Sequence, residues 1–135
     1  MFAPGEIIYG YAKCLFRPKF KYAVSIFRND ELNILAQFTT SQDRRGYVIE
    51  AGQELGLHPK KGSVFSFPKR TVMAYDYGFL YGTENQLVSQ FDNPEVVCKM
   101  YDEVYINLVY SLYKSDFSPT EYKPFLEKIL TEFYK

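Results

Sequence analysis

The segment 39–45, with the sequence TTSQDRR, gathers side chains that bind phosphate and sugar groups. It follows the apolar run 32–38 directly, so its polar residues begin where a strand is expected to end. Hydroxyl groups are short hydrogen-bond donors, the Gln42 amide can read a base edge or a sugar hydroxyl, and guanidinium groups bind phosphate oxygens. A solvated, inactive loop between strands is the alternative interpretation of the same segment.

A predicted β-hairpin brings further cations to this segment. The runs 20–27 and 32–38 both place apolar residues at alternate positions, and the sequence RNDE between them is typical of a turn. If the two runs pair, Lys21 lies near the open end of the hairpin, close to the residues that follow the second strand. The side chains that could converge on this rim are Arg17, Lys19, Lys21, Thr39, Thr40, Ser41, Gln42, Arg44 and Arg45.

The charge of the chain is divided unevenly between its halves. The chain has 16 Lys and Arg against 16 Asp and Glu, but residues 1–70 hold 11 basic against 6 acidic residues, and residues 71–135 hold 5 against 10. This asymmetry indicates that the first half faces an anionic partner, with nucleic acid as the sharper interpretation and an ordinary solvated surface as the plainer one. The basic clusters are Arg17 with Lys19 and Lys21, Arg44 with Arg45, Lys60 with Lys61, and Lys69 with Arg70.

Length and composition predict a single globular domain over residues 1–135. Hydrophobic residues make up 47% of the chain and charged residues 24%, which argues against disorder. Aromatic residues make up 19%, so rings are expected to fill the core, while exposed rings that stack on bases cannot be identified from sequence. No apolar run approaches a membrane span, the N-terminus lacks signal-peptide features, and Cys14 and Cys98 are isolated. We therefore expect a reduced, cytoplasmic protein without a membrane partner.

Alternating patterns predict an α+β fold whose first 90 residues are strands. The expected strands are 5–16, 20–27, 32–38, 46–49, 62–67 and 70–82, with a loop or a short helical turn over 51–62. Five to six short strands favour a small, closed or nearly closed β-barrel formed by residues 1–90. Residues 93–135 are expected to form a helical tail packed on the barrel.

The tail carries two helix-start signals. Asn93 followed by Pro94 and Glu95 predicts a helix that continues to Leu112 with apolar residues at helical spacing. Near Ser118 the spacing of a capping box predicts a second helix, with Pro124 expected to kink or delay it.

The usual catalytic and cofactor motifs are absent from the sequence. There is no GxxxxGK[ST], GxGxxG, HExxH or GxSxG, and the cysteines have no metal-ligand spacing. The single histidine, His58, lies in the turn-like sequence LHPKKG and is expected to be inactive. We therefore predict no metal site and no cofactor.

Three short motifs resemble the PemK/MazF toxin family. The sequence PGEI at residues 4–7 is similar to the G-[DE]-[IV] that opens the family's first strand. KYAVSI (21–26) resembles its RP-x-LVI strand, and FTTSQ (38–42) resembles the I-T-[SA]-Q that follows. The similarity covers residues 4–112 in outline. It implies an SH3-like β-barrel with C-terminal helices and a metal-independent endoribonuclease activity.

The resemblance also implies roles for individual residues. The family's strand-end threonine falls on Thr40, with Thr39 as the register alternative, and its arginine falls on Lys21. Lys21 and Thr40 would then stabilise the phosphorane formed when an RNA 2′ hydroxyl attacks its own phosphate, which leaves a 2′,3′-cyclic phosphate. Asp43 is the nearest acid that could accept the 2′ proton. The flanking RNA backbone would be held by Arg44, Arg45, Lys69 and Arg70.

Three functions remain open at this point. The first is an endoribonuclease toxin, whose partners would be RNA, an antitoxin protein and a second copy of the chain in a homodimer. The second is a non-catalytic small-barrel module that binds RNA or protein. The third is a protein-interaction scaffold that works through its aromatic helices, in which Tyr105 and Tyr110 would matter more than Lys21.

Overall fold

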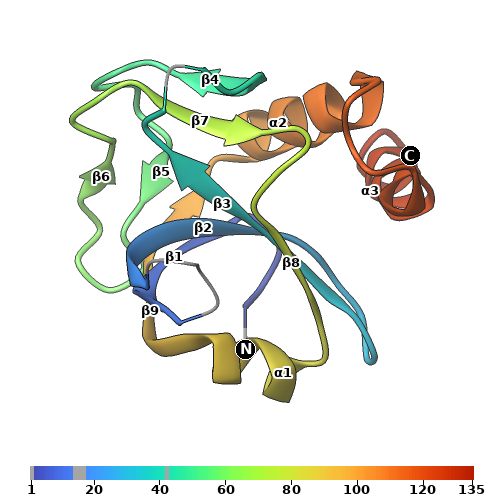
Figure 1. Ribbon diagram of the computed structural model, residues 1–135. Helices are drawn as coiled ribbons and strands as arrows, with labels where there is room; N and C mark the ends of the chain where they lie inside the picture. The colour runs from blue at the N-terminus through green and yellow to red at the C-terminus, as the bar shows by residue number, and fades with distance from the viewer. Residues whose placement is uncertain (1, 14–17, 42) are drawn as a thin grey trace.

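The computed structural model describes residues 2–13, 18–41 and 43–135, and within them the chain is an α+β protein (Figure 1). The strands pair antiparallel and curl into a half-barrel, with the order β4-β7-β3-β2-β1-β9-β5-β6 and with β8 also paired to β3. The strands among the described residues are β1 (Glu6–Ala12), β2 (Lys19–Arg28), β3 (Asn33–Thr39), β4 (Gly46–Ile49), β5 (Gly56–Leu57), β6 (Val64–Phe65), β7 (Thr71–Ala74), β8 (Phe79–Gly82) and β9 (Phe91–Met100).

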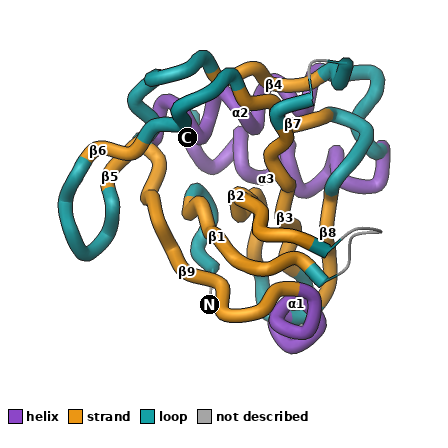
Figure 2. The backbone as a smooth tube through the Cα atoms, turned by 60° about the vertical axis from the view of Figure 1, so that its left-hand side comes forward, coloured by secondary structure: helices purple, strands orange, loops and turns teal. Residues whose placement is uncertain are grey.

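The three α-helices of the described residues lie on the two sides of this sheet (Figure 2). The first two have acidic residues in their first turns, and the last one follows a short 3₁₀ turn at Thr120–Tyr122. No helix in the described part of the chain has the length and apolar character needed to span a bilayer. The helices are α1 (Glu84–Gln90), α2 (Asp102–Lys114) and α3 (Lys123–Phe133).

The central part of the sheet is buried on both faces, because its strands carry apolar residues on each side. One face of β2 and β3 carries Ile26 and Ile34, which pack in the larger core with Leu108 and Leu112 of α2. The opposite face carries Leu35, which packs with residues of α1 and the start of β9. Every residue from Asn33 to Phe38 is buried as a consequence. In Figure 2 α1 lies at the opposite side of the strands from α2 and α3.

The predicted hairpin of residues 20–27 and 32–38 is confirmed, and it forms the centre of the sheet. β2 and β3 pair antiparallel from Ala23 opposite Gln37 to Arg28 opposite Asn33. The short strand predicted at 46–49 is also confirmed as β4.

The helix predicted from Pro94 is wrong in its first part. Residues Phe91–Met100 form strand β9, which pairs with β1 and β5, and α2 begins only at Asp102. Asn93 has a left-handed φ of 48°, and Asn93 and Pro94 together lie opposite Gly10 of β1 as a β-bulge. A bulge tolerates a proline within a strand because its backbone nitrogen needs no ladder partner. The sequence Asn-Pro-Glu therefore marks a bulge here, although it is also typical of a helix start.

Three other predicted elements differ in the structure. The strand expected over 70–82 is divided into β7 and β8 by a bend at Tyr75–Tyr77, and the loop at 51–62 contains strand β5. Helix α1 was not predicted, although Thr83 and Gln86 form a capping box at its start. The strand predicted over 5–16 ends at Ala12 as β1, and part of its remainder lies outside the described residues.

The junction of α2 and α3 is held by side chains that cap the end of α2. Ser118 Oγ donates to the Leu112 carbonyl at 2.6 Å, so Ser118 does not form the predicted capping box. The Lys123 ammonium group donates to the carbonyls of Leu112 at 3.3 Å, of Tyr113, and of Ser115 at 2.7 Å. These bonds satisfy carbonyls that the helix end would leave without partners. Helix α3 begins at Lys123 with Pro124 in its first turn, so the proline delays the helix as predicted.

Candidate functional site

A pocket lies where β2 and β3 separate. Beyond Gln37, β3 no longer pairs with β2, and Phe38 and Thr39 pair instead with Met73 and Val72 of β7. The first residues of β2 remain paired only with β1. The separation opens a pocket of about 310 Å³ between the two strands, which we call the inner pocket. Its lining includes Lys19, Lys21, Thr39, Thr40, Lys69 and Thr71.

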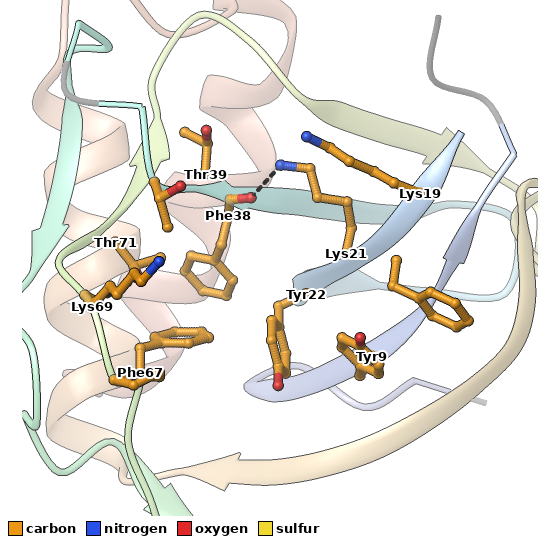
Figure 3. Close-up of a pocket in the computed structure, with 12 residues that line it drawn as sticks. Tyr9, Lys19, Lys21, Tyr22, Phe38, Thr39, Phe67, Lys69 and Thr71 are labelled. Atoms are coloured by element: carbon orange, nitrogen blue, oxygen red, sulfur yellow. Dashed lines mark hydrogen bonds between the residues drawn. The ribbon is translucent and has the colours of Figure 1, made fainter. Parts of the chain in front are cut away.

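Lys21 spans the gap between the separated strands (Figure 3). Its Nζ donates to the Phe38 carbonyl at 2.9 Å, which satisfies a backbone oxygen at the point where the β2–β3 ladder stops. Burial lowers the pKa of the Lys21 ammonium group, and the positive charge of Lys19 lowers it further. Lys21 therefore gives up its proton more easily than an ordinary exposed lysine.

Threonine hydroxyls and a third lysine come from the β3 end and from the segment before β7. The Thr71 hydroxyl donates to the Lys69 carbonyl at 2.9 Å, so it helps to fix the backbone that carries the Lys69 side chain. Thr39 Oγ1 accepts from the backbone nitrogen of Ser41 at 3.1 Å and orders the turn after β3. Thr40, the predicted catalytic threonine, lies next to it and lines the pocket.

Aromatic rings form a further wall of the inner pocket. Tyr9 lies directly across from Tyr22 in the β1–β2 ladder, with ring centroids 4.5 Å apart, and Tyr9 stacks on Phe20 at 5.5 Å. Phe67 contacts both Tyr22 and Phe38, with centroid distances of 5.1 Å in each case. Phe20 is 60% exposed, so a ring face is available to a ligand at the mouth of the pocket.

A second pocket of about 320 Å³ adjoins the first, and we call it the outer pocket. It shares Lys19, Lys21, Phe38 and Thr39 with the inner pocket. Its own lining consists of Gln37, Ser41, Arg44, Ala74, Tyr77 and Gly78. The Arg44 guanidinium lies 4.0 Å from the centre of the Tyr77 ring.

The structure brings most of the predicted rim residues together. Lys19, Lys21, Thr39, Thr40 and Lys69 line the inner pocket, and Ser41 and Arg44 line the outer pocket. The predicted positions Arg17 and Gln42 lie outside the described residues.

Three predicted residues do not line either pocket. Asp43 is exposed in the turn before Arg44, and Arg70 is half-buried between Lys69 and β7. The Arg45 guanidinium lies over the Phe117 ring at 4.5 Å, so Arg45 faces the α2–α3 junction. The roles of Asp43, Arg45 and Arg70 toward a ligand stay predictions.

The chemistry of the two pockets is cationic and aromatic, because no Asp, Glu or His is among the described residues that line either one. His58 lies elsewhere, where its Nδ1 accepts from the backbone nitrogens of Lys60 and Lys61 and stabilises a turn. Burial raises the pKa of the Cys98 thiol to about 12, so this thiol is not a nucleophile at neutral pH. No group of three potential metal ligands occurs within residues 2–13, 18–41 and 43–135. The lining suits an anionic ligand that also presents flat rings.

Sequence reasoning did not identify the aromatic wall or Gln37. A usable signal was present, because Tyr9 and Tyr11 and then Phe20 and Tyr22 occupy alternate positions of two strands that pair. Alternate positions share one face of a sheet, so these four rings had to meet. Comparison of the chain with protein-family models, with curated proteins and with solved structures gives no match.

Proposed function

We propose that this protein binds single-stranded RNA across the inner and outer pockets and cleaves it without a metal ion. The observation that carries the proposal is the lining of the inner pocket, where three lysines and three threonines face an aromatic wall without any carboxylate. Phosphate groups are bound by lysines and hydroxyls, and unpaired bases stack on aromatic rings. Both kinds of group line this one pocket, as a nucleotide requires.

The proposed reaction is attack of an RNA 2′ hydroxyl on the adjacent phosphorus. The new 2′ oxygen–phosphorus bond forms while the bond from phosphorus to the 5′ oxygen breaks, which leaves a 2′,3′-cyclic phosphate and a 5′ hydroxyl. Lys21, with its lowered pKa, takes the 2′ proton in its neutral form and returns it to the leaving 5′ oxygen. Lys21 then carries a positive charge beside the phosphorane, to which the Thr40 hydroxyl donates a hydrogen bond.

This assignment gives the proton transfer to Lys21 rather than to Asp43. Asp43 is the nearest acid along the chain, but it does not line either pocket, whereas the Lys21 ammonium group points into the gap between β2 and β3 (Figure 3). A general base must lie within hydrogen-bonding distance of the proton that it removes, directly or through one water molecule.

The proposal extends to fold type and partners through the resemblance to PemK/MazF toxins. The half-barrel would then be an SH3-like barrel, and the protein would be the cytoplasmic toxin of a toxin–antitoxin system. An acidic antitoxin segment would cover the lysines of the inner pocket, and a second copy of the chain would complete a homodimer.

A non-catalytic RNA-binding module is the second candidate function. It is favoured by the absence of a carboxylate and of histidine from both linings, since these are the commonest proton acceptors in enzymes. Binding would then depend on the same lysines and rings, and no bond would be broken.

The test is incubation of RNA in EDTA with the wild-type protein and with Lys21→Ala, Thr40→Ala and Lys60→Ala. Lys60→Ala is the matched control, because it removes an exposed lysine outside both pockets. We expect new cyclic-phosphate and 5′-hydroxyl ends with the wild type and the control, and their loss in the other two variants. Salt-sensitive RNA binding with intact RNA would support the non-catalytic module. If the folded protein neither binds nor cleaves RNA, the proposal is overturned.

A further inference from the structure

The outer pocket contains a buried acceptor that has no donor. Gln37 is 7% exposed, and its side-chain oxygen Oε1 has no hydrogen-bond partner among the described residues. A buried amide oxygen without a partner is unfavourable, and such a group in a native protein calls for an explanation. Since Gln37 lines the outer pocket, a ligand bound there could supply the missing donor.

The surroundings of Gln37 restrict the chemistry of that donor. Lys19, Lys21 and Arg44 line the same pocket and no carboxylate does, so a cationic amine would be repelled. The donor must therefore be an N–H or O–H group of a neutral or anionic ligand. The Arg44–Tyr77 pair offers this ligand a flat guanidinium and an aromatic ring 52% exposed, both of which stack on planar groups.

The connection between the two pockets indicates how one ligand could occupy both. Lys19 and Lys21 line the inner and the outer pocket alike, so they lie at the boundary between the two. A phosphate at this boundary would place one nucleotide in the inner pocket and its neighbour in the outer pocket. The neighbouring base would then lie between Gln37 and the Arg44–Tyr77 pair.

We propose that the outer pocket selects a base with an exocyclic amino group, whose N–H donates to Gln37 Oε1. This inference rests on the proposed RNA-binding function and adds a rule for sequence preference. Cytosine has the required amino group at ring position 4, whereas uracil has a carbonyl there. A carbonyl would face another acceptor, so uracil is disfavoured at this position.

The experiment compares short deoxycytidine and deoxyuridine oligomers of equal length, which have the same charge and cannot be cleaved through a 2′ hydroxyl. Fluorescence anisotropy at fixed salt measures their affinities for the wild-type protein. One hydrogen bond to a base is expected to make cytosine bind about three- to tenfold more tightly than uracil. Equal affinities would overturn the proposal, whatever the variants do.

Two variants separate base reading from general effects. Gln37→Met removes the acceptor while keeping the length of the side chain, and we expect it to bind both oligomers equally without a lower thermal midpoint. Gln90→Met is the matched control, because Gln90 Oε1 also lacks a partner among the described residues but belongs to neither pocket. The control should keep the preference for cytosine.

The remaining outcomes are equally decisive. A preference for cytosine that survives in Gln37→Met would show that another residue reads the base, which overturns the role of Gln37. Binding of ribonucleotide oligomers alone, with deoxy oligomers inert, would mean that Gln37 reads a 2′ hydroxyl instead. Failure of every oligomer to bind would overturn the proposed RNA function, and with it this inference.

Discussion

The two ends of the β2–β3 hairpin are built from the same two strands, but one end is closed by pairing and the other opens into the two pockets. At the turn end Asn29 Oδ1 accepts from the backbone nitrogens of Glu31 and Leu32, and the Asn29 nitrogen donates to the Leu32 carbonyl. β8 pairs with the outer edge of β3 along Asn33–Ala36, so the backbone of β3 has a partner on each side. This end is closed by backbone pairing, and its turn residues Arg28–Glu31 are exposed.

At the open end the strands change partners. β3 pairs with β7 there, β2 remains with β1, and the Lys21 side chain replaces the missing ladder bond with one to the Phe38 carbonyl. The lysine that closes this gap is also the lysine whose pKa is lowered by burial. A pocket can therefore form where regular strand pairing ends and a side chain takes over a hydrogen bond of the backbone.

The largest expected effect is on the closed end, from Leu35→Ala. Leu35 is fully buried between β2 and α1, so its truncation leaves a cavity. The free energy of unfolding should fall by about 2–5 kcal/mol, measured by urea denaturation. The folded fraction should bind RNA as before, and a specific loss of RNA affinity would contradict the division between the two ends.

Lys21→Met should have the reverse pattern at the open end. RNA cleavage should fall about 10²- to 10⁴-fold, the contribution typical of a group that transfers protons in the transition state. The free energy of unfolding should change by less than about 1.5 kcal/mol, because the lost hydrogen bond is offset by relief from burying an ammonium group. Initial rates and urea denaturation of the same preparation give both quantities. Unfolding of the variant at room temperature would show that Lys21 is mainly structural.

A smaller effect is expected from Asn29→Ala at the turn. The variant loses two bonds from its side chain to backbone nitrogens, which should cost about 1 kcal/mol of stability. Thermal unfolding measures the loss, with Asp30→Ala as a control in the same exposed turn. A change in RNA affinity would mean that the turn influences the open end.

The smallest expected effect is the pH dependence of Lys21. Its pKa is lowered in the folded state, so the unfolded chain binds more protons at pH values between that pKa and the ordinary 10.5. The free energy of unfolding contributed by this group therefore rises with pH across that interval, while RNA affinity falls as the ammonium charge is lost. Titrations of both quantities should show these opposite trends in the wild type. A trend that persists unchanged in Lys21→Met would assign it to other groups.

Sequence patterns predicted the hairpin because both of its strands have clear alternation and a polar turn between them. They also located the residues of the inner pocket at the end of β3, where Thr39 is the last residue of the strand and Thr40 follows it. The start of α2 was missed because Asn93 and Pro94 suit a bulge as well as a helix start, and only the pairing with β1 distinguishes the two. Pairing between distant strands is a tertiary effect that local propensity does not contain.

The aromatic wall could have been predicted in part, and Gln37 could not. The four rings of β1 and β2 share a face by their spacing, but Phe67 joins them from a segment with no pairing signal. Gln37 lies within a strand whose neighbours are apolar, and only the burial of its amide without a partner distinguishes it from a solvated glutamine. Unsatisfied hydrogen bonds become visible only when the packing around a residue is known.

The hydrogen bonds of Lys123 link the local unfolding of α3 to that of the end of α2. Its ammonium group holds the final carbonyls of α2 from the first turn of α3, so α2 cannot keep its end intact when α3 detaches. Amide protons near the end of α2 should therefore exchange with solvent in the same opening event as those of α3. Residues 115–135 are by this argument a cooperative part of the fold, joined to the end of α2 by the side chains of Ser118 and Lys123.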